Sequence, residues 1–500
     1  MSIKSIAAKI YASWVHQKTQ RWASAPHETQ QRVFKSLIKA ARTTEFGRDH
    51  DFGSINSHAD FVSRVPVRDY EGLKPYVERI KEGVSDVLWP GKPLYFAKTS
   101  GTTSGVKYIP ITGPGMKAQV EASKNAILSY IHETGQAGFV DRKMIFLQGS
   151  PELTEVGGIK TGRLSGISAH FVPAYLQKNR LPSWKTNCIE DWESKVEAIV
   201  AETKEQDMGV IAGIPSWVQM YFERLQAHTG KSTKALFPNF QLFIYGGVNY
   251  EPYRAKFEAL MGGRVDSIEL FPASEGFFAY QDKQQERGML LLLNSGIFYE
   301  FIEAASFHEP TAKRLTLDQV RIGVDYVLII STQSGLWGYN MGDTVQFTST
   351  TPYRVIVSGR IKHFISAFGE HVIAKEVEYA MQQALAQSDA QINEFTVAPQ
   401  ITPESGLPYH EWLIDFEKMP SDLEAFAQAL DLAMRGQNTY YDDLIAGSVL
   451  RSLVITPLGH HCFSDYMRSL GRLGGQNKVQ RLSNDRQMAD ALHSFNTLAK

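Results

Sequence analysis

Short apolar segments that alternate with helical segments constrain the fold of this chain more than any other feature. The apolar segments begin after about Leu94, are bounded by turn residues and occupy 143–148, 210–214, 242–245 and 326–330. Runs of this kind are typical of strands buried on both faces of a sheet. The intervening segments with helical spacing are 115–131, 191–204 and 215–228. The alternation predicts an α/β architecture with a largely parallel sheet.

Two further stretches depart from this alternation of strands and helices. The first hundred residues are predicted to be mainly helical, with helices over 2–22 and 29–43, and Pro66 ends any longer helix in the turn-rich stretch 52–68. The segment 288–302 has the pattern of a β-meander. We therefore expect a mixed sheet in the main body.

A second folding unit is predicted from about Ser358 to the end of the chain. Its expected elements are a helix over 374–387, strands over 394–398 and 411–416, a helix from Ser421, a strand near 449–456 and a helix near 485–498. Ser421 and Glu424 have the spacing of a capping box, which predicts that the second helix of this unit begins at Ser421. The unit would be a compact α+β domain of about 140 residues.

Composition excludes several classes of protein. The 500 residues carry 52 basic and 53 acidic side chains, and this balance argues against nucleic acid as a partner. The two cysteines, Cys188 and Cys462, are too few for a disulfide framework, which favours a reducing compartment. We see neither a signal peptide nor an apolar run long enough to span a bilayer. The expectation is a soluble cytoplasmic protein with no membrane partner.

The segment 98–107 has the composition of a phosphate-binding loop. It contains five hydroxyl side chains and two glycines and ends at Lys107, directly after an apolar run. Glycines allow close backbone approach, hydroxyls and amides donate hydrogen bonds, and a lysine neutralises charge. The spacing is not that of a Walker A motif. On composition alone, a flexible Ser/Gly/Thr loop is slightly favoured over phosphate binding.

Three other segments contain residues that can carry chemistry. Glu275 lies among small and aromatic residues in 269–278, where it could bind a metal ion. Asp343 follows a glycine at a predicted strand end and could accept ribose hydroxyls. Lys478 lies in a glycine-rich stretch, 471–481, that could deliver a cation to a site. Taken singly, each is more often an ordinary loop or turn residue. The run 459–462 contains two histidines and a cysteine, but without a second cluster it does not predict a metal site.

In this order, the four segments resemble the core motifs of the adenylate-forming superfamily. The chain most closely resembles the Gretchen Hagen family of acyl-acid amido synthetases. Additional segments that resemble this family's signatures are 41–48, 65–70, 74–77, 246–249 and 358–361. The resemblance thus covers nearly the whole chain.

The resemblance implies a fold and a reaction. The fold would be a large N-terminal α/β domain of layered sheets and helices, 1–357, with a small mobile α+β C-terminal domain, 358–500. The reaction would use ATP and Mg²⁺ and would have two steps. A small-molecule carboxylic acid would attack the α-phosphate of ATP to give an acyl-adenylate and pyrophosphate. An amino acid would then displace AMP to form an amide.

The resemblance also assigns roles to individual residues. The phosphates would be held by Thr99, Ser100, Gly101, Thr102, Thr103, Ser104 and Lys107. The adenine would be flanked by Gly246, Gly247 and Val248, and the nucleotide would lie beside Ala273 and Ser274. Glu275 would bind Mg²⁺, Asp343 the ribose, and Lys478 would act in adenylation, with Arg360 and Lys362 at the hinge. Asn477 and Gln480 depart from the family pattern around that lysine.

Two alternatives remain open at the level of sequence. An acyl-CoA ligase would share the adenylation step but transfer the acyl group to a thiol, and a non-catalytic nucleotide-binding scaffold would need neither Glu275 nor Lys478. His170, Phe171, Tyr175 and Trp217 could line an acyl pocket or belong to the core. No pattern identifies the acid, the amine or the oligomeric state.

Overall fold

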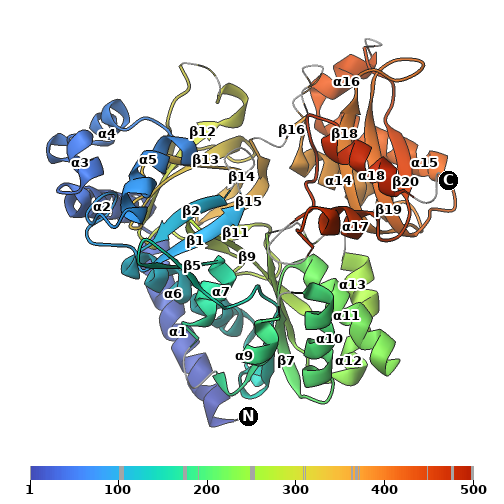
Figure 1. Ribbon diagram of the computed structural model, residues 1–500, viewed down its shortest axis with the longest axis horizontal. Helices are drawn as coiled ribbons and strands as arrows, with labels where there is room; N and C mark the ends of the chain where they lie inside the picture. The colour runs from blue at the N-terminus through green and yellow to red at the C-terminus, as the bar shows by residue number, and fades with distance from the viewer. Residues whose placement is uncertain are drawn as a thin grey trace. The chain divides into compact units, whose positions relative to one another are not determined.

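The computed structural model forms two compact units. Unit 1 comprises Met1–Gly247 and Val265–Ile356, and unit 2 comprises Val248–Arg264 and Val357–Lys500. The described residues are 2–100, 106–172, 177–189, 191–247, 250, 254–307, 309, 311–361, 364–365, 367, 370, 372–446, 449–473 and 478–496. Unit 1 contains layered sheets and helices and unit 2 is a smaller α+β unit (Figure 1), which confirms the predicted fold class.

An eleven-stranded mixed sheet forms the centre of unit 1, in the order β12-β13-β14-β15-β11-β10-β9-β8-β7-β3-β6. Strands β6, β3, β7, β8 and β9 run parallel, and the pairs from β9 to β11 and from β12 to β14 are antiparallel. The strands are β3 (Lys143–Phe146), β6 (Arg180–Leu181), β7 (Met208–Ala212), β8 (Leu242–Gly246), β9 (Asp266–Ala273), β10 (Gly276–Tyr280), β11 (Met289–Leu291), β12 (Ile297–Glu303), β13 (Asp325–Thr332), β14 (Tyr339–Thr350) and β15 (Tyr353–Arg360).

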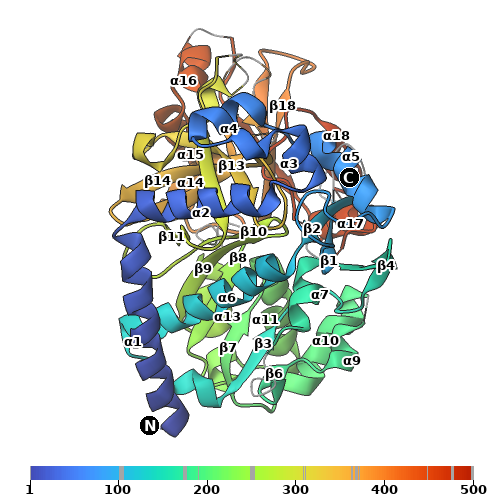
Figure 2. The same cartoon turned by 90° about the vertical axis from the view of Figure 1, so that its left-hand side faces the viewer.

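A four-stranded sheet and a set of helices complete unit 1. The smaller sheet has the order β2-β1-β5-β4, with β1 (Tyr95–Ser100), β2 (Val106–Ile111), β4 (Thr154–Val156) and β5 (Ile159–Gly162). The helices are α1 (Ile3–Ala23), α2 (Pro26–Ala41), α3 (Glu45–Asp49), α4 (His58–Arg64), α5 (Tyr70–Lys81), α6 (Gly113–Thr134), α7 (Leu164–Ala169), α9 (Trp184–Asn187), α10 (Trp192–Thr203), α11 (Pro215–Thr229) and α12 (Thr233–Leu236). Figure 2 shows α1 on the outside of the unit, and α1 packs against α6.

The predicted helices and strands of unit 1 are confirmed within a few residues, but the predicted β-meander over 288–302 is wrong. Strands β11 and β12 do form in that segment. However, β11 pairs with β10 and β15, whereas β12 pairs with β13. The segment therefore joins two separate parts of the sheet, because pairing with more distant strands buries its apolar side chains.

Unit 2 contains the three-stranded sheet β18-β19-β20 and the hairpin β16-β17. Its elements are α13 (Arg254–Met261), β16 (Phe364–Ile365), β17 (Val372–Ile373), α14 (Ala374–Ala386), β18 (Gln391–Gln400), β19 (Tyr409–Lys418), α15 (Leu423–Gln437), α16 (Thr439–Ala446), β20 (Val454–Leu458), α17 (Cys462–Ser469) and α18 (Gln487–Phe495). The predicted capping box at Ser421 is wrong. Asp422 caps α15 by accepting from the Ala425 amide, while Ser421 bonds to Asp389.

Both cysteines, Cys188 and Cys462, are free thiols. Among the described residues, no helix combines the length and the apolar character needed to cross a membrane. These two observations concern the described part of the chain alone.

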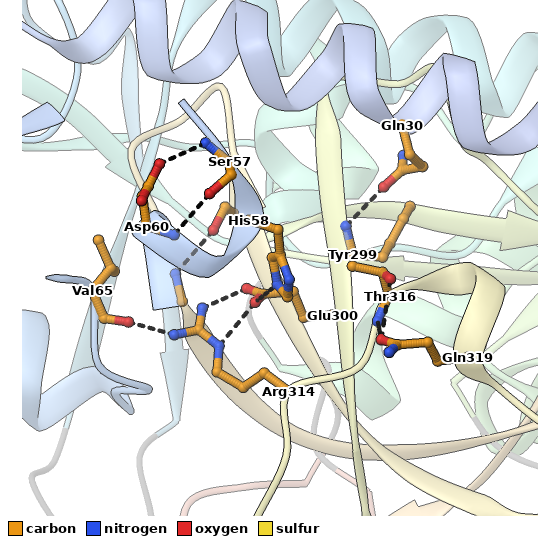
Figure 3. A network of polar contacts seen from close by, with 12 residues as sticks. Gln30, Ser57, His58, Asp60, Val65, Tyr299, Glu300, Arg314, Thr316 and Gln319 are labelled. Carbon is orange, nitrogen blue, oxygen red and sulfur yellow. Dashed lines mark hydrogen bonds and ion pairs between the residues drawn. The ribbon is translucent and has the colours of Figure 1, made fainter. Parts of the chain in front are cut away.

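A fully buried carboxylate, Glu300, lies on the edge strand β12 (Figure 3). Arg314 donates to it from Nε at 2.8 Å and from Nη2 at 2.5 Å, and His58 lies 2.7 Å from Oε1. Glu300 is 0% exposed, so its charge depends on these partners for compensation. Gln30 of α2 also pairs with the backbone of β12, accepting from the Tyr299 amide at 2.9 Å. The edge strand is thereby covered.

Glu300, Arg314 and His58, here called the Glu300 cluster, also fix the chain that flanks β14. The Arg314 guanidinium donates from Nη1 to the Val65 carbonyl. Three residues later, the Arg68 amide donates to the Gly338 carbonyl at 3.0 Å and the Arg68 carbonyl accepts from Asn340 at 2.8 Å. A continuous set of contacts thus runs from the buried carboxylate to the first residues of β14.

We expect Glu300→Gln to lower the free energy of unfolding by about 3–5 kcal/mol, because it leaves the Arg314 charge buried without its counter-ion. Glu303→Gln is the matched control on the same strand. Its partner Arg321 is 67% exposed, and loss of that surface pair should leave the free energy of unfolding close to that of the wild type. Urea unfolding of both variants measures the difference, and equal losses would contradict the account.

The pair of Glu300 and Arg314 also predicts that the free energy of unfolding falls in acid. Burial alone would raise the pKa of Glu300, but the hydrogen bonds from His58 and Arg314 and the Arg314 charge outweigh it and lower the pKa. A carboxyl with a lowered folded-state pKa stabilises the protein above its unfolded pKa of about 4.3 and loses this contribution as the pH falls through the folded pKa. The stability difference between wild type and Glu300→Gln should therefore shrink in acid.

Candidate active site

The predicted phosphate-binding segment connects two paired strands. Strands β1 and β2 are antiparallel, and Thr99 and Lys107 are directly opposite each other in the register. Ser100 pairs with Val106 through the backbone at the end of the ladder. Gly101, Thr102, Thr103 and Ser104 lie outside the described residues. Of the predicted phosphate ligands, the structure therefore brings Thr99 and Lys107 together on neighbouring strands.

Glu275 lies in a two-residue turn between β9 and β10. Ala273 and Gly276 are paired across this turn, so Ser274 and Glu275 form its tip. Glu275 is half-buried, and the Tyr339 hydroxyl lies 3.5 Å from its Oε1. Tyr339 is the first residue of β14 and is buried. The carboxylate of Glu275 therefore lies beside the first residue of β14.

A small cavity surrounds Glu275. Residues from three other segments line it: the start of α6, the start of β12 and the end of β13. The lining residues are Gly115, Ala118, Gln119, Glu275, Gly276, Phe277, Ser295, Ile297, Thr332, Gln333 and Ser334. Apart from Glu275, none of these residues was assigned a role from the sequence. Gly276 and Phe277 belong to the segment 269–278 that contains Glu275, whereas the others lie in segments without a recognisable motif.

Glycines and a helix cap set the close packing of the cavity wall. Thr112 caps α6 and donates from Oγ1 to the Gln333 carbonyl at 2.8 Å, which attaches the start of α6 to the end of β13. A Cβ on Gly115 would lie 2.3 Å from Ser334 Oγ, and a Cβ on Gly276 would lie 2.7 Å from Ile297 Cδ1. Larger residues at these positions would close the cavity.

Asp343 lies at an irregularity of β14. Val327 pairs with Thr344 and Ile329 pairs with Asn340, so residues 341–343 bulge opposite one residue of β13. Gly342 has φ +87°, and its amide donates to Asn340 Oδ1 at 2.8 Å. A bulge changes the direction of the neighbouring side chains, here including that of Asp343. The glycine before the aspartate is therefore a conformational requirement.

Gly246 and Gly247 lie at the carboxyl end of β8. In open α/β sheets, ligands bind beside the carboxyl ends of parallel strands. A Cβ on Gly246 would lie 2.5 Å from the Leu270 carbonyl oxygen, and Gly247 has φ +85°, so glycine is needed at both positions. Val248, the third residue predicted to flank adenine, lies outside the described residues.

A buried lysine, Lys195, supports the loop after β3, a strand that is separated from β8 by β7. Lys195 of α10 donates from Nζ to the carbonyls of Gln148, at 3.0 Å, and Asn187, at 2.6 Å. Burial, together with the nearby Arg163 charge, lowers the pKa of Lys195 to about 8. Its two carbonyl partners attach the loop after β3 to α10. A lysine in a helical pattern is normally exposed, so the sequence held no signal for this contact.

The remaining predicted residues belong to unit 2. Arg360 is the exposed last residue of β15, and Lys362 lies outside the described residues. Lys478 is exposed and precedes a segment that is attached to β18. There the Arg481 guanidinium donates to Glu394 at 2.7 Å and stacks 4.0 Å from the Phe395 ring, and Thr396 bonds to the Gln480 carbonyl. Arg481 thus acts as an anchor a few residues after Lys478.

The residues considered for an acyl pocket have different surroundings in the structure. Trp217 is buried in the core against Trp192, at 4.5 Å between ring centroids. Phe171 packs beside Tyr95, and His170 is exposed and bonds to the Pro151 carbonyl. Tyr175 lies outside the described residues. In the part of the chain that the structure describes, no group of three or more His, Cys, Asp or Glu side chains is arranged to hold a metal ion.

Two solved structures share this fold over nearly its full length. The GH3.15 acyl acid amido synthetase in complex with 2,4-DB superposes with a TM-score of 0.79 at 16% identity, covering 97% of this chain and 96% of that one. A 2-hydroxyisobutyryl-CoA ligase in its postadenylation state gives a TM-score of 0.61 at 14% identity, covering 94% and 92%. The fold is that of the adenylate-forming enzymes.

Sequence comparison narrows this class to one family. Three family models match in order: the GH3 family N-terminal domain at 15–187, central domain at 290–360 and C-terminal domain at 375–487. A jasmonoyl–L-amino acid synthetase of Nicotiana attenuata is 20% identical over 80% of this chain and 81% of its own. An indole-3-acetic acid-amido synthetase of Arabidopsis thaliana is 21% identical over 74% of both. The chain belongs to the GH3 family, as its resemblance to the Gretchen Hagen synthetases predicted.

The bulge at Asp343 leads to a testable prediction. Gly342→Ala should lower the free energy of unfolding by about 1–2 kcal/mol, since a left-handed backbone is strained for any residue with a Cβ. Gly53→Ala is the matched control, because a Cβ meets nothing within 4 Å at either glycine and only Gly342 has a positive φ. The control should be neutral or slightly stabilising. Similar losses in both variants, by chemical unfolding, would refute the conformational argument.

Proposed function

We propose that this protein is an ATP-dependent acid–amino acid ligase, which converts a small carboxylic acid to an acyl-adenylate and then to an amide. The observation that carries the proposal is the position of Glu275 and Asp343 at irregular backbone of the large sheet, with Glu275 in the turn between β9 and β10 and Asp343 after the bulge of β14. The names of the curated relatives describe the same class of reaction with jasmonic and indole-3-acetic acids. The two free cysteines support a cytoplasmic location.

The residues of unit 1 suit a nucleotide with bound Mg²⁺. Mg²⁺ prefers oxygen ligands and is usually held by one or two carboxylates together with substrate phosphates. Glu275 offers one such carboxylate beside the cavity, so the phosphates of ATP would supply the remaining oxygens. When bound, the metal ion would withdraw charge from the phosphates. The pairing of Thr99 with Lys107 places a hydroxyl and a cation on the strands that lead into the phosphate-binding segment.

The proposed first step needs positioning and charge neutralisation rather than a covalent enzyme intermediate. An oxygen of the substrate carboxylate attacks the α-phosphorus, the bond to the β-phosphate oxygen breaks, and pyrophosphate leaves. Lys478 would stabilise the negative charge that develops on the phosphoryl oxygens. Asp343 would accept the ribose hydroxyls, and Gly246 and Gly247 would leave room for the adenine. Arg360 and Lys362 would lie at the hinge of a mobile C-terminal domain.

The second proposed step transfers the acyl group to nitrogen. The unprotonated amine of an amino acid attacks the acyl carbon, AMP leaves with the bonding electrons, and the amine loses a proton. A coenzyme A thiol is the alternative acceptor, and the fold shared with 2-hydroxyisobutyryl-CoA ligase keeps it as the second candidate. Membership of the GH3 family favours the amine.

We expect acid-dependent exchange of labelled pyrophosphate into ATP. Lys478→Ala should slow the exchange about a hundredfold to a thousandfold, because it removes one donor to developing charge. Glu275→Ala should slow it as well and should raise the Mg²⁺ concentration needed for half-maximal exchange. Lys92→Ala, at an exposed lysine, is the control. Absence of exchange with every acid in a broad panel would favour the non-catalytic scaffold instead.

A second experiment separates the two acceptors. The acyl-adenylate formed from the best acid of the panel should release AMP faster with amino acids than with coenzyme A. Mass spectrometry should identify an amide as the product. Faster AMP release with coenzyme A than with every amino acid, and a thioester product, would assign the protein as an acyl-CoA ligase.

A further inference from the structure

Helix α1 carries a row of exposed apolar side chains that the proposed enzyme chemistry does not explain. Ile3, Ile6, Ile10 and Trp14, here called the outer stripe, are 86%, 48%, 68% and 48% exposed. They are separated by three or four positions, so they lie along one side of the helix. Tyr11 stacks beside Trp14, with 5.5 Å between ring centroids, and extends the apolar surface.

The outer stripe lies opposite the face by which α1 packs on unit 1. The buried residues of α1 are Ser5, Ala12, Val15, Thr19 and Trp22, and the helix contacts α6 and the turn at 138–141. At 3.6 residues per turn, Ile10 and Ala12 are about 200° apart. The helix therefore has two apolar faces. A helix that is apolar on both sides is typical of one with a partner on each side.

The charge of α1 restricts the kind of partner that the outer stripe can bind. The helix contains four cations, Lys4, Lys9, Lys18 and Arg21, and no acidic residue, although the whole chain is nearly neutral. Lys18 Nζ lies 3.5 Å from the centre of the Trp14 ring, so a cation borders the outer stripe directly. Lys4, at one end of the helix, lies 3.9 Å from Asp141, and Asp282 and Glu133 act on His16 on the side that packs against unit 1. A second copy of this helix would oppose like charges along its length, which disfavours a symmetric pairing.

We propose that the outer stripe of α1 binds the surface of an anionic lipid membrane. The isoleucines would enter the boundary between headgroups and acyl chains, and Trp14 and Tyr11 would lie at the headgroup level. Lys9, Lys18 and Arg21 would meet the lipid phosphates. The sequence predicted no membrane partner because no segment is long enough to span a bilayer, but a helix that lies on the surface needs no span. Such binding would place the enzyme beside acids that partition into membranes.

Vesicle co-sedimentation of the full chain tests this proposal. Wild-type protein should bind vesicles of phosphatidylcholine and phosphatidylglycerol in equal amounts, bind pure phosphatidylcholine weakly, and dissociate as salt is added. The double variant Ile10→Ser with Trp14→Ser should reduce binding by at least about tenfold, through lost apolar burial. Ile322→Ser is the matched control, because Ile322 is also an exposed isoleucine of unit 1, at 59%. It should bind as the wild type does.

Three results would overturn the proposal. The first is no binding to the anionic vesicles, and the second is equal binding by the double variant. The third is a concentration-dependent dimer in light scattering that the double variant abolishes, without lipid binding, which would assign the stripe to a second copy. Both substituted side chains are exposed, so the double variant should fold. A circular dichroism spectrum and a thermal unfolding midpoint like those of the wild type would show that it does.

Discussion

A carboxylate that must stay ionised inside the protein, Glu300, links the edge of the large sheet to the candidate active site. Its charge is compensated by Arg314 and His58, and Arg314 also holds the Val65 carbonyl. That contact aligns the segment ending at Arg68 with the start of β14. Because a buried ion pair is costly to break, this alignment is rigid. Tyr339, the first residue of β14, then contacts Glu275.

The site itself consists of irregular backbone at the ends of regular elements. Glu275 lies in a two-residue turn, Asp343 follows a bulge with Gly342 at φ +87°, and Gly246 ends a parallel strand. Such positions expose polar groups beside a ligand while the strands on either side keep them in place. The rigid sheet and the buried pair therefore serve the same purpose, which is to hold a few side chains in a constant geometry.

Local patterns predicted what depends on local structure. Periodicity located α6, α10 and β13 within a few residues. Glycine-containing motifs singled out Glu275 and Asp343 as candidate site residues. The pairing of β11 and β12 with distant strands was missed because no local pattern encodes it. The Glu300 cluster was missed for the same reason, since His58 lies 242 positions from its partner. Gln333 and Ser334 of the cavity lie in no motif, and only the attachment of α6 to β13 places them beside Glu275.

The central claim is that unit 1 holds the nucleotide beside Glu275 and Asp343. A crystal structure with ATP, Mg²⁺ and the acid selected by pyrophosphate exchange tests it most directly. The account predicts a metal ion on the Glu275 carboxylate, ribose hydroxyls within hydrogen-bond distance of Asp343, and adenine beside Gly246 and Gly247. A nucleotide bound elsewhere, or one beside these residues with Glu275 turned away from the metal ion, would contradict it.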